Sequence, residues 1–294
     1  MSDATLASSV FVDANDAITF ASSLLTGQGV SAEDSAAIAT CLVQADLRGV
    51  QTHGMSRLPI YVKRVERGLV NPVPSMKLTK PMAACASLDG DNGFGFLIGI
   101  RAMREAIEMA ETCGVGVVSA HNSNHFGMAA SYLLQAVTAG YFAFVFTNAA
   151  KSMPPWGGRE GLFGTSPFGA AAPAGKLPPF VLDMSPAVAA RGKIRLAEKR
   201  SESIPEGYAL DENGQSTTDP TAALRGVVLP IGTYKGSGIS MLMEILSGVF
   251  SGANFGGDVP DQYTVMDRPQ NVGHFFMAMK PGIFVTEQGF RDRM

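Results

Sequence analysis

Cysteine and tryptophan are scarce in this sequence. Its 294 residues include one tryptophan and three cysteines, Cys41, Cys85 and Cys113. The cysteines show neither paired nor metal-like spacing, and a small odd number is typical of a reduced intracellular protein. We therefore expect a cytoplasmic protein without disulfides.

An excess of basic residues and long apolar runs are also missing. The net charge is −3, with acids and bases interspersed, so the sequence gives no sign of a nucleic-acid partner. The longest apolar stretches, Tyr141–Phe146 and Ile239–Phe250, are too short or too interrupted to span a bilayer. The first residues lack the basic and apolar regions of a signal peptide. We expect neither nucleic acid nor a membrane as partner.

Apolar residues and glycine are plentiful. The chain is 46% hydrophobic and 17% charged, which is enough to bury a large core. The 33 glycines are typical of many tight turns and of close backbone approaches, such as those around a buried ligand.

The first 75 residues show helical periodicity. Helices are predicted over 14–25, from a capping box at Ser31 to about Leu47, and over 55–67. The prolines of 71–75 indicate a linker. We therefore predict a helical N-terminal domain over 1–75, followed by a second region over 76–294.

Strand and helix patterns alternate in the second region, which predicts the α/β class. Strand 114–120, a helix to about 138 and strand 141–147 indicate a right-handed crossover with locally parallel pairing. The stretch 151–179 is rich in Gly and Pro and is predicted to be a functional loop. Further elements are expected as follows: extended chain at 77–88, helices at 96–111, 187–199, 235–251 and from 286, strands at 180–184, 227–231 and 273–279, and a hairpin at 208–215.

The segment from Leu47 to Arg57 carries the first chemical signal. His53 passes a proton near neutral pH, and the Arg57 guanidinium, four residues on, is suited to a planar carboxylate. The pair suits a site that orients and protonates a small carboxylated substrate. A structural hydrogen bond of His53 in a helix connection is the alternative.

His121 and His125 are four residues apart, a spacing that favours a metal only on one helix face. The metalloprotease glutamate is missing between them. Gly127 precedes a predicted helix, where free N–H groups would favour a cofactor phosphate. A capping loop with a hydrogen-bonded histidine is the alternative.

Standard nucleotide-binding motifs are not found. Gly93-Phe-Gly95 breaks the G-x-G-x-x-G pattern at its third glycine, and Lys235 precedes its glycines, unlike the lysine of a Walker loop. Lys235 at a helix start either contacts a phosphate or is solvated.

Asp183 ends an apolar strand, where a carboxylate is costly to bury without a partner. An imidazolium partner and a helix cap for 186–199 are equally supported. Asn148 and Thr165 are either hydrogen-bond partners of a substrate or ordinary turn residues. No G-x-S-x-G motif supports a serine nucleophile.

Taken together, these segments resemble the malate/L-lactate dehydrogenase-like family of NAD(P)-dependent oxidoreductases, from about residue 14 to the end. The similarity lies in motifs in the right order: Thr52-His53-Gly54 with Arg57, Asn124-His125-Phe126-Gly127, Thr147-Asn148, Pro155-Trp-Gly-Gly158, Gly164-Thr-Ser-Pro167, Asp183-Met-Ser, Ile204-Pro-Glu-Gly207, Thr218-Asp-Pro220 and Lys235-Gly-Ser-Gly238.

The resemblance implies a non-Rossmann fold with a helical N-terminal domain, a mixed-sheet cofactor domain and a homodimer. It implies His53 as acid-base, Asp183 as its relay partner with Thr52 beside it, and Arg57, Thr165 and Asn148 as substrate ligands. NADH or NADPH would contact His125, Phe126, Gly127, Met128 and Ala129, then Pro173, Ala174 and Gly175, and finally Tyr234 and Lys235.

Three features depart from the family pattern. Thr52 stands where a serine is common, and Ser166 replaces the asparagine of the G-T-N-P motif. The sequence ends at Met294, inside a segment that the family continues, so the C-terminal tail looks shortened.

The reaction implied is hydride transfer between nicotinamide and C2 of a small 2-oxo, 2-hydroxy or cyclic 2-imino acid. Two alternatives stay open: a metal-dependent hydrolase using His121, His125 and Asp183, and a degenerate member of the family that does not hold its cofactor.

Overall fold

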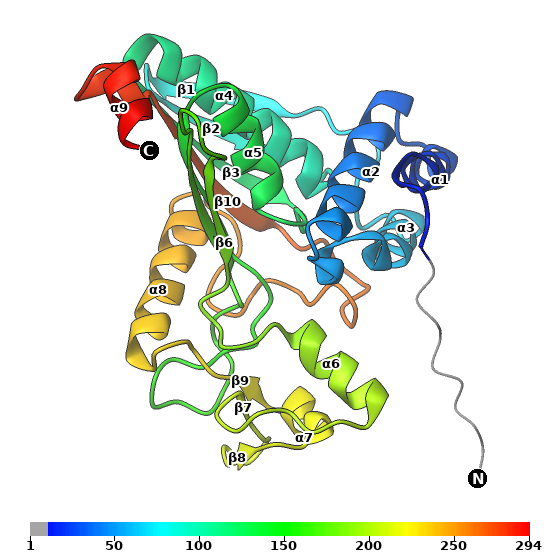
Figure 1. Cartoon of the computed structure of the whole chain (residues 1–294). Coiled ribbons are helices and arrows are strands. Elements are labelled where there is room, and N and C mark those ends of the chain that lie inside the picture. The colour runs from blue at the N-terminus through cyan, green and yellow to red at the C-terminus, as the bar shows by residue number, and fades with distance from the viewer. Residues whose placement is uncertain (1–10) are drawn as a thin grey trace.

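A computed structural model describes residues 11–294, so residues 1–10 of the predicted N-terminal domain lie outside the described part. Three helices, α1–α3, lie to one side of a seven-stranded sheet, and a small lobe of short strands and helices lies below it (Figure 1). None of the described helices combines the length and apolar character that crossing a membrane requires.

The predicted N-terminal helices are present. Helix α1 spans Ala14–Gly27, and α2 spans Ala32–Leu47. The predicted cap at Ser31 is confirmed, because its hydroxyl accepts the Asp34 N–H at 3.1 Å. The third predicted helix begins instead with two 3₁₀ turns, η1 (Gln51–His53) and η2 (Met55–Arg57), and continues as α3 (Leu58–Glu66).

The segment that carries His53 is fixed against α2 by Asp46. The Asp46 carboxylate accepts the Met55 N–H at 2.8 Å, and a Cβ at Gly54 would lie 2.0 Å from a carboxylate oxygen. Any larger residue at position 54 would therefore displace the turn that presents His53.

The sheet has the order β1-β2-β3-β10-β4-β5-β6. These strands span Lys77–Met82, Cys85–Asp89, Val115–Ser123, Val272–Met279, Phe142–Thr147, Phe168–Ala172 and Phe180–Met184 in that order. The parallel pair is β2 and β3, joined by α4 (Gly95–Cys113), and the other pairs are antiparallel.

The predicted pairing of β3 with β4 is wrong. Strand β10, from the C-terminal part of the chain, lies between them and pairs antiparallel with both. The two strands therefore run in the same direction without sharing hydrogen bonds. The region predicted as irregular also contains β5, whose Phe-Gly-Ala-Ala-Ala sequence lacks the β-branched residues that favour a strand.

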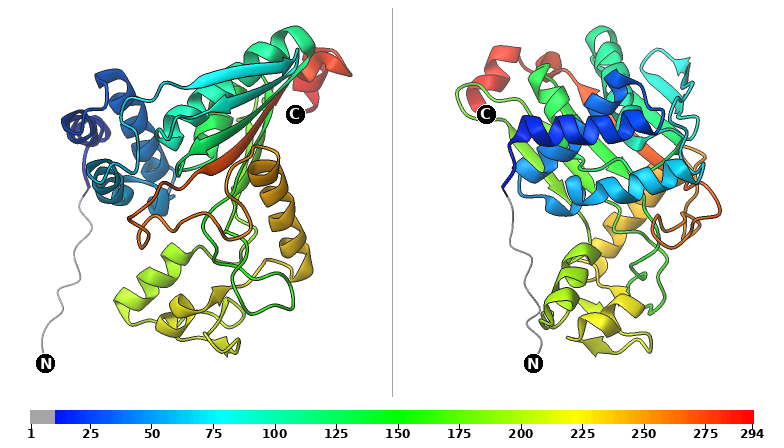
Figure 2. Two further views of the ribbon diagram at one scale, coloured as in Figure 1. Left: turned by 180° about the vertical axis from the view of Figure 1, so that it is seen from behind. Right: turned by 90° about the vertical axis from the view of Figure 1, so that its right-hand side faces the viewer.

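Helices α4 and α5 (Ala130–Thr138) cover one face of the sheet (Figure 2). Alternate residues of β4 are buried beneath them, as period-2 side-chain geometry requires. A second core forms between α1–α3 and the start of α4, where Phe94 and Phe96 are buried. The N-terminal helices therefore rest on the end of α4 that leads to the site.

The small lobe contains α6 (Arg191–Arg200), β7 (Ala209–Leu210), β8 (Ser216–Thr217), α7 (Pro220–Arg225) and β9 (Val227–Val228). The predicted hairpin between β7 and β8 is confirmed. Helix α6 begins later than predicted, because Ala187 and Val188 pair with the chain near Pro230.

Helix α8 (Tyr234–Glu244) follows the lobe and continues as a π turn, η3 (Ile245–Val249), which packs on β10 and β4. The chain ends with a 3₁₀ turn, η4 (Pro281–Ile283), and α9 (Glu287–Arg293).

Candidate active site

A cavity of about 140 Å³ lies where the η1 and η2 turns between α2 and α3, the sheet and the small lobe meet. His53 and Arg57 both line it, as the sequence predicts. Thr165 and Asn148 lie in its wall, so all four residues come together from three separate segments. Other residues that line it include Thr52, His125, Lys151, Arg191, Arg195, Asp261 and Tyr263.

The imidazole of His53 is held by its neighbour in sequence. The Thr52 hydroxyl lies 2.9 Å from Nδ1 of His53, which leaves Nε2 for a reactant. Burial, and secondarily the charge of Arg57, lower the pKa of His53 to about 4. The ring is therefore neutral at pH 7, which prepares it to accept a proton.

The guanidinium of Arg57 is fixed at two points. Its Nε donates to the Thr52 carbonyl at 2.5 Å, and Nη1 donates to the Tyr263 hydroxyl at 2.5 Å. Tyr263 comes from a loop about 200 residues downstream, and no sequence motif predicted its role. Among residues 11–294, Nη2 of Arg57 has no hydrogen-bond partner, so this group can donate to a carboxylate.

A second imidazole, His125, lies beside the first. The two rings stack with centroids 5.5 Å apart. Nδ1 of His125 accepts the Gly127 N–H at 3.2 Å and lies 2.8 Å from the Tyr61 hydroxyl. An amide N–H only donates, so the proton of the neutral ring sits on Nε2. Burial lowers the pKa of His125 well below its ordinary value.

A second cavity, of about 360 Å³, lies on the other side of His53. Thr52, His53 and Gly127 line both cavities, so His53 stands at the boundary between them. Met128 and Ala129, predicted as cofactor contacts, line the second cavity. Arg48 lines it as well, and sequence reasoning missed this residue.

Asp183 also lines the second cavity, but its carboxylate accepts a hydrogen bond from the first turn of α5. Oδ2 accepts the Ala130 N–H at 2.8 Å. Within residues 11–294, no hydrogen bond or ion pair joins Asp183 to His53. Asp183 is thus a helix cap, although for α5 rather than for the helix after position 186. We expected the helix terminus after Gly127, which is the start of α5, to be free for a cofactor phosphate. The Asp183 carboxylate partly occupies it instead.

Asn148 is buried and holds two strands together. Its Oδ1 accepts the Gly273 N–H at 3.0 Å, and its Nδ2 donates to the Asn254 carbonyl at 2.6 Å. Ser166, which stands where the family pattern has asparagine, donates to the buried carboxylate of Glu244 at 3.3 Å. These contacts fix the wall of the first cavity around Thr165.

Two predicted cofactor segments line neither cavity. Pro173, Ala174 and Gly175 follow β5 at the end away from His53, where the Ala174 carbonyl contacts Arg291. Tyr234 and Lys235 begin α8 and are exposed. Between residues 11 and 294 no group of three metal-ligating side chains comes together.

The malate/L-lactate dehydrogenase family matches residues 12–294. A malate dehydrogenase from Pyrococcus abyssi is 36% identical over 293 residues, which is 97% of this chain and 80% of that protein. An NAD⁺ ureidoglycolate dehydrogenase from Escherichia coli is 34% identical over 266 residues, 90% of this chain and 76% of that protein.

A solved structure of the sulfolactate dehydrogenase from Methanocaldococcus jannaschii aligns with a TM-score of 0.90. It is 37% identical, over 97% of this chain and 82% of that one. The fold and site thus define an α/β oxidoreductase with a non-Rossmann sheet. The chain belongs to the malate/L-lactate dehydrogenase family, and it is an NAD(P)-dependent dehydrogenase.

Proposed function

We propose that the protein transfers hydride between nicotinamide C4 and C2 of a small 2-oxo, 2-hydroxy or cyclic 2-imino acid. The observation that carries the proposal is the position of His53 between two cavities, with Arg57 in the first of them. The first cavity would take the acid and the second the nicotinamide ring, so that the imidazole meets both.

Arg57 would bind the substrate carboxylate. Its bonds to the Thr52 carbonyl and the Tyr263 hydroxyl hold the guanidinium plane in place before the substrate arrives. Preorganisation of this kind reduces the entropy lost on binding. Thr165 and Asn148 would complete the wall around C2 and its oxygen or nitrogen.

His53 would move the proton. The neutral ring takes the hydroxyl proton when a 2-hydroxy acid is oxidised. In reduction it must first be protonated, and a carboxylate bound to Arg57 favours this by offsetting the positive charge that lowers the pKa of His53. Asp183 would stabilise the imidazolium from across the second cavity, without a direct hydrogen bond.

The second cavity suits a flat ring of low charge. Val50, Met128 and Val181 give it apolar walls, and Arg48 adds a cation for a phosphate. NADH or NADPH would supply the hydride there. Gly127, Met128 and Ala129 would hold the ring. His125 and Phe126 line the first cavity and stay predicted cofactor contacts, as do Pro173 to Gly175 and Tyr234 with Lys235 for the more distant parts of the cofactor.

The proposal also covers the domain organisation, the cellular compartment and the oligomeric state. We propose two domains, residues 1–75 and 76–294, with the described residues 11–75 on one side of the cleft, and we propose a cytoplasmic homodimer. Exposed apolar residues on α8, on η3 and directly after η3 support association: Met241 is 48% exposed, Val249 53% and Phe250 70%. Light scattering on the purified protein gives the mass that decides between one copy and two.

A reduction screen tests the function. We expect oxidation of NADH or NADPH with 2-oxo acids or cyclic 2-imino acids. His53→Ala should lower turnover by about 10²–10⁴, the usual contribution of general acid–base catalysis. Turnover of His53→Ala within a factor of three of wild type would refute the role of His53.

A titration of both reduced cofactors, followed by nicotinamide fluorescence, separates this function from a degenerate protein. Binding of neither cofactor would favour the degenerate reading. The metal-dependent hydrolase has no supporting cluster in the described part of the chain.

A further inference from the structure

Arg64 is the largest fully buried side chain among the described residues. It lies on α3 and is 1% exposed. Within residues 11–294 it has no ion-pair partner. Burial lowers the pKa of Arg64, and the charge of Asp261 acts in the opposite direction. Burying a cation without an ion pair lowers stability, so stability alone does not account for an arginine at this position.

The guanidinium of Arg64 holds a turn that lies far downstream in the chain. Its Nη1 donates to the carbonyls of Gln262 at 3.3 Å and Val265 at 3.2 Å, and more weakly to Sδ of Met266 at 3.9 Å. Nε and Nη2 have no hydrogen-bond partner in the described part of the chain. The two carbonyl bonds therefore fix the path of the backbone between residues 262 and 265.

Internal hydrogen bonds close this turn, residues 261–266. One carboxylate oxygen of Asp261 accepts the N–H groups of Tyr263 at 2.8 Å and Thr264 at 3.0 Å. The Asp261 carbonyl accepts the Val265 N–H at 3.0 Å. Because these bonds make the 261–266 turn a unit, holding two of its carbonyls also fixes the place from which Tyr263 extends.

Tyr263 connects the 261–266 turn to Arg57. Its hydroxyl accepts Nη1 of Arg57 at 2.5 Å, and Cζ of Arg57 lies 5.4 Å from the centroid of its ring. About two helical turns separate Arg57 from Arg64, and both arginines contact the same turn. Arg64 thus holds the backbone of the turn, while the side chain of Tyr263 holds Arg57.

We propose that Arg64 is a positioning residue for Arg57. It holds the 261–266 turn so that the Tyr263 hydroxyl keeps the Arg57 guanidinium in the orientation that binds the substrate carboxylate. Arg64 lines neither cavity, so it acts on the substrate only through Tyr263 and Arg57. This inference rests on the proposed function, because Arg57 is assigned there to the substrate carboxylate.

Steady-state kinetics of Arg64→Met test the proposal with the acid that is reduced fastest in the screen. Methionine keeps an unbranched apolar stem and removes the donor to both carbonyls. We expect KM for the acid to rise about 10-fold, the lower end of the value of a hydrogen bond to a charged group. KM for the cofactor should stay within about a factor of three. Arg64→Lys keeps a cation and a donor and should recover part of the loss. An unchanged KM for the acid in Arg64→Met would overturn the proposal.

A second background separates positioning from a general loss of structure. Tyr263→Phe removes the hydroxyl that holds Arg57 and keeps the ring. In this background Arg64→Met should raise KM for the acid by less than about threefold, because the bond through which Arg64 acts is already missing. An equal rise in both backgrounds would show that Arg64 acts independently of Tyr263, and the proposal would fail.

Arg101→Met is the matched control. Arg101 lies on α4 and lines neither cavity, and its Nη1 donates to the Met76 carbonyl at 3.3 Å. The substitution therefore also breaks a bond between an arginine and a backbone carbonyl. Urea unfolding measures the stability of both variants, and KM for the acid in Arg101→Met should equal that of wild type. A similar rise of KM in both variants would assign the effect to stability and contradict a positioning role.

Hydrogen exchange followed by mass spectrometry tests the hold on the turn without turnover. The N–H groups of Tyr263, Thr264 and Val265 are bonded within the 261–266 turn, so their exchange reports its opening. We expect faster exchange there in Arg64→Met and unchanged exchange in the sheet. Unchanged exchange in the turn would overturn the proposal.

The two readouts separate this inference from the proposed function. If wild type reduces no acid, the proposed function fails, and faster exchange of the turn in Arg64→Met still supports the hold of Arg64 on the turn. Faster exchange with an unchanged KM for the acid would leave the proposed function standing and refute the link from Arg64 to Arg57.

Discussion

The hydroxyl of Thr52 fixes the ring of His53 by a contact of 2.9 Å to Nδ1. We expect Thr52→Val to lower kcat by about 3- to 10-fold, because a neutral hydrogen bond contributes about 0.5–1.5 kcal/mol. Thr52→Ser keeps the hydroxyl and should stay close to wild type. Steady-state kinetics of the two variants test this expectation. Equal kcat values for Thr52→Val and Thr52→Ser would show that the Thr52 hydroxyl makes no contribution to catalysis.

The sequence predicts those site residues that are close together along the chain. Thr52, His53 and Arg57 lie within two consecutive turns, so their proximity follows from local structure alone. Tyr263 and Arg195 reach the same cavity from a loop and a helix whose positions depend on tertiary packing. The i, i+4 spacing of Arg191 and Arg195 was visible, but many surface helices share it.

At the scale of elements, Asp183 connects β6 to the start of α5. Asp183→Ala removes the acceptor of the Ala130 N–H and should lower the free energy of unfolding by about 0.5–2 kcal/mol, as expected for the loss of a helix cap. It should also lower kcat, because the carboxylate faces the second cavity. Urea unfolding and kinetics on the same preparation measure both effects.

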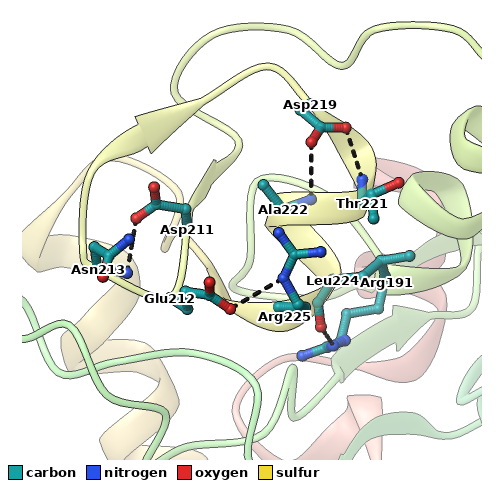
Figure 3. Close-up of polar contacts among 9 residues, drawn as sticks. All are labelled: Arg191, Asp211, Glu212, Asn213, Asp219, Thr221, Ala222, Leu224 and Arg225. Atoms are coloured by element: carbon teal, nitrogen blue, oxygen red, sulfur yellow. Dashed lines mark hydrogen bonds and ion pairs between the residues drawn. The ribbon is translucent and has the colours of Figure 1, made fainter.

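Asp219 provides a matched control for that cap. Its carboxylate accepts the N–H groups of Thr221 at 3.0 Å and Ala222 at 3.2 Å at the start of α7, away from both cavities (Figure 3). Asp219→Ala should cost similar stability and leave kcat unchanged. If the two variants lose kcat equally, Asp183 has no role in catalysis beyond stability.

Helix positions and types were largely predictable, because caps and apolar periodicity are local. The sheet was not. Nothing in the sequence near β3 or β4 shows that β10, more than 100 residues later, separates them. Strand β5 escaped prediction because its small residues pack beneath Leu133 and Ala129 of the α5 region, where tertiary contacts outweigh propensity.

At the scale of the whole molecule, three buried or half-buried histidines make folding sensitive to acid. Burial lowers the pKa of His53 to about 4, that of His274 to about 3 and that of His125 well below its ordinary value. Below pH 6.5 the unfolded chain binds protons that the folded chain does not. The free energy of unfolding should therefore fall steadily from pH 6.5 toward pH 4.

Unfolding in urea at half-unit pH steps measures this slope. His274 joins β3 to β4, since its ring contacts the hydroxyls of Ser123 and Thr147 at 2.7 Å each. His274→Gln should lower stability at pH 7 and flatten the slope below pH 6.5. A wild-type free energy that stays constant from pH 7 to pH 5 would contradict the neutral, buried state of these rings.

The central claim is that hydride is added to C2 of the acid while His53 protonates the oxygen or nitrogen bonded to C2. The direct measurement uses reduced nicotinamide that carries two deuterium atoms at C4 and follows the reduced acid by mass spectrometry and NMR. We expect one deuterium at C2 of the product. His53→Gln should form that product at least about 100-fold more slowly while still binding the cofactor. A product without deuterium at C2, or an unchanged rate in His53→Gln, would contradict the account.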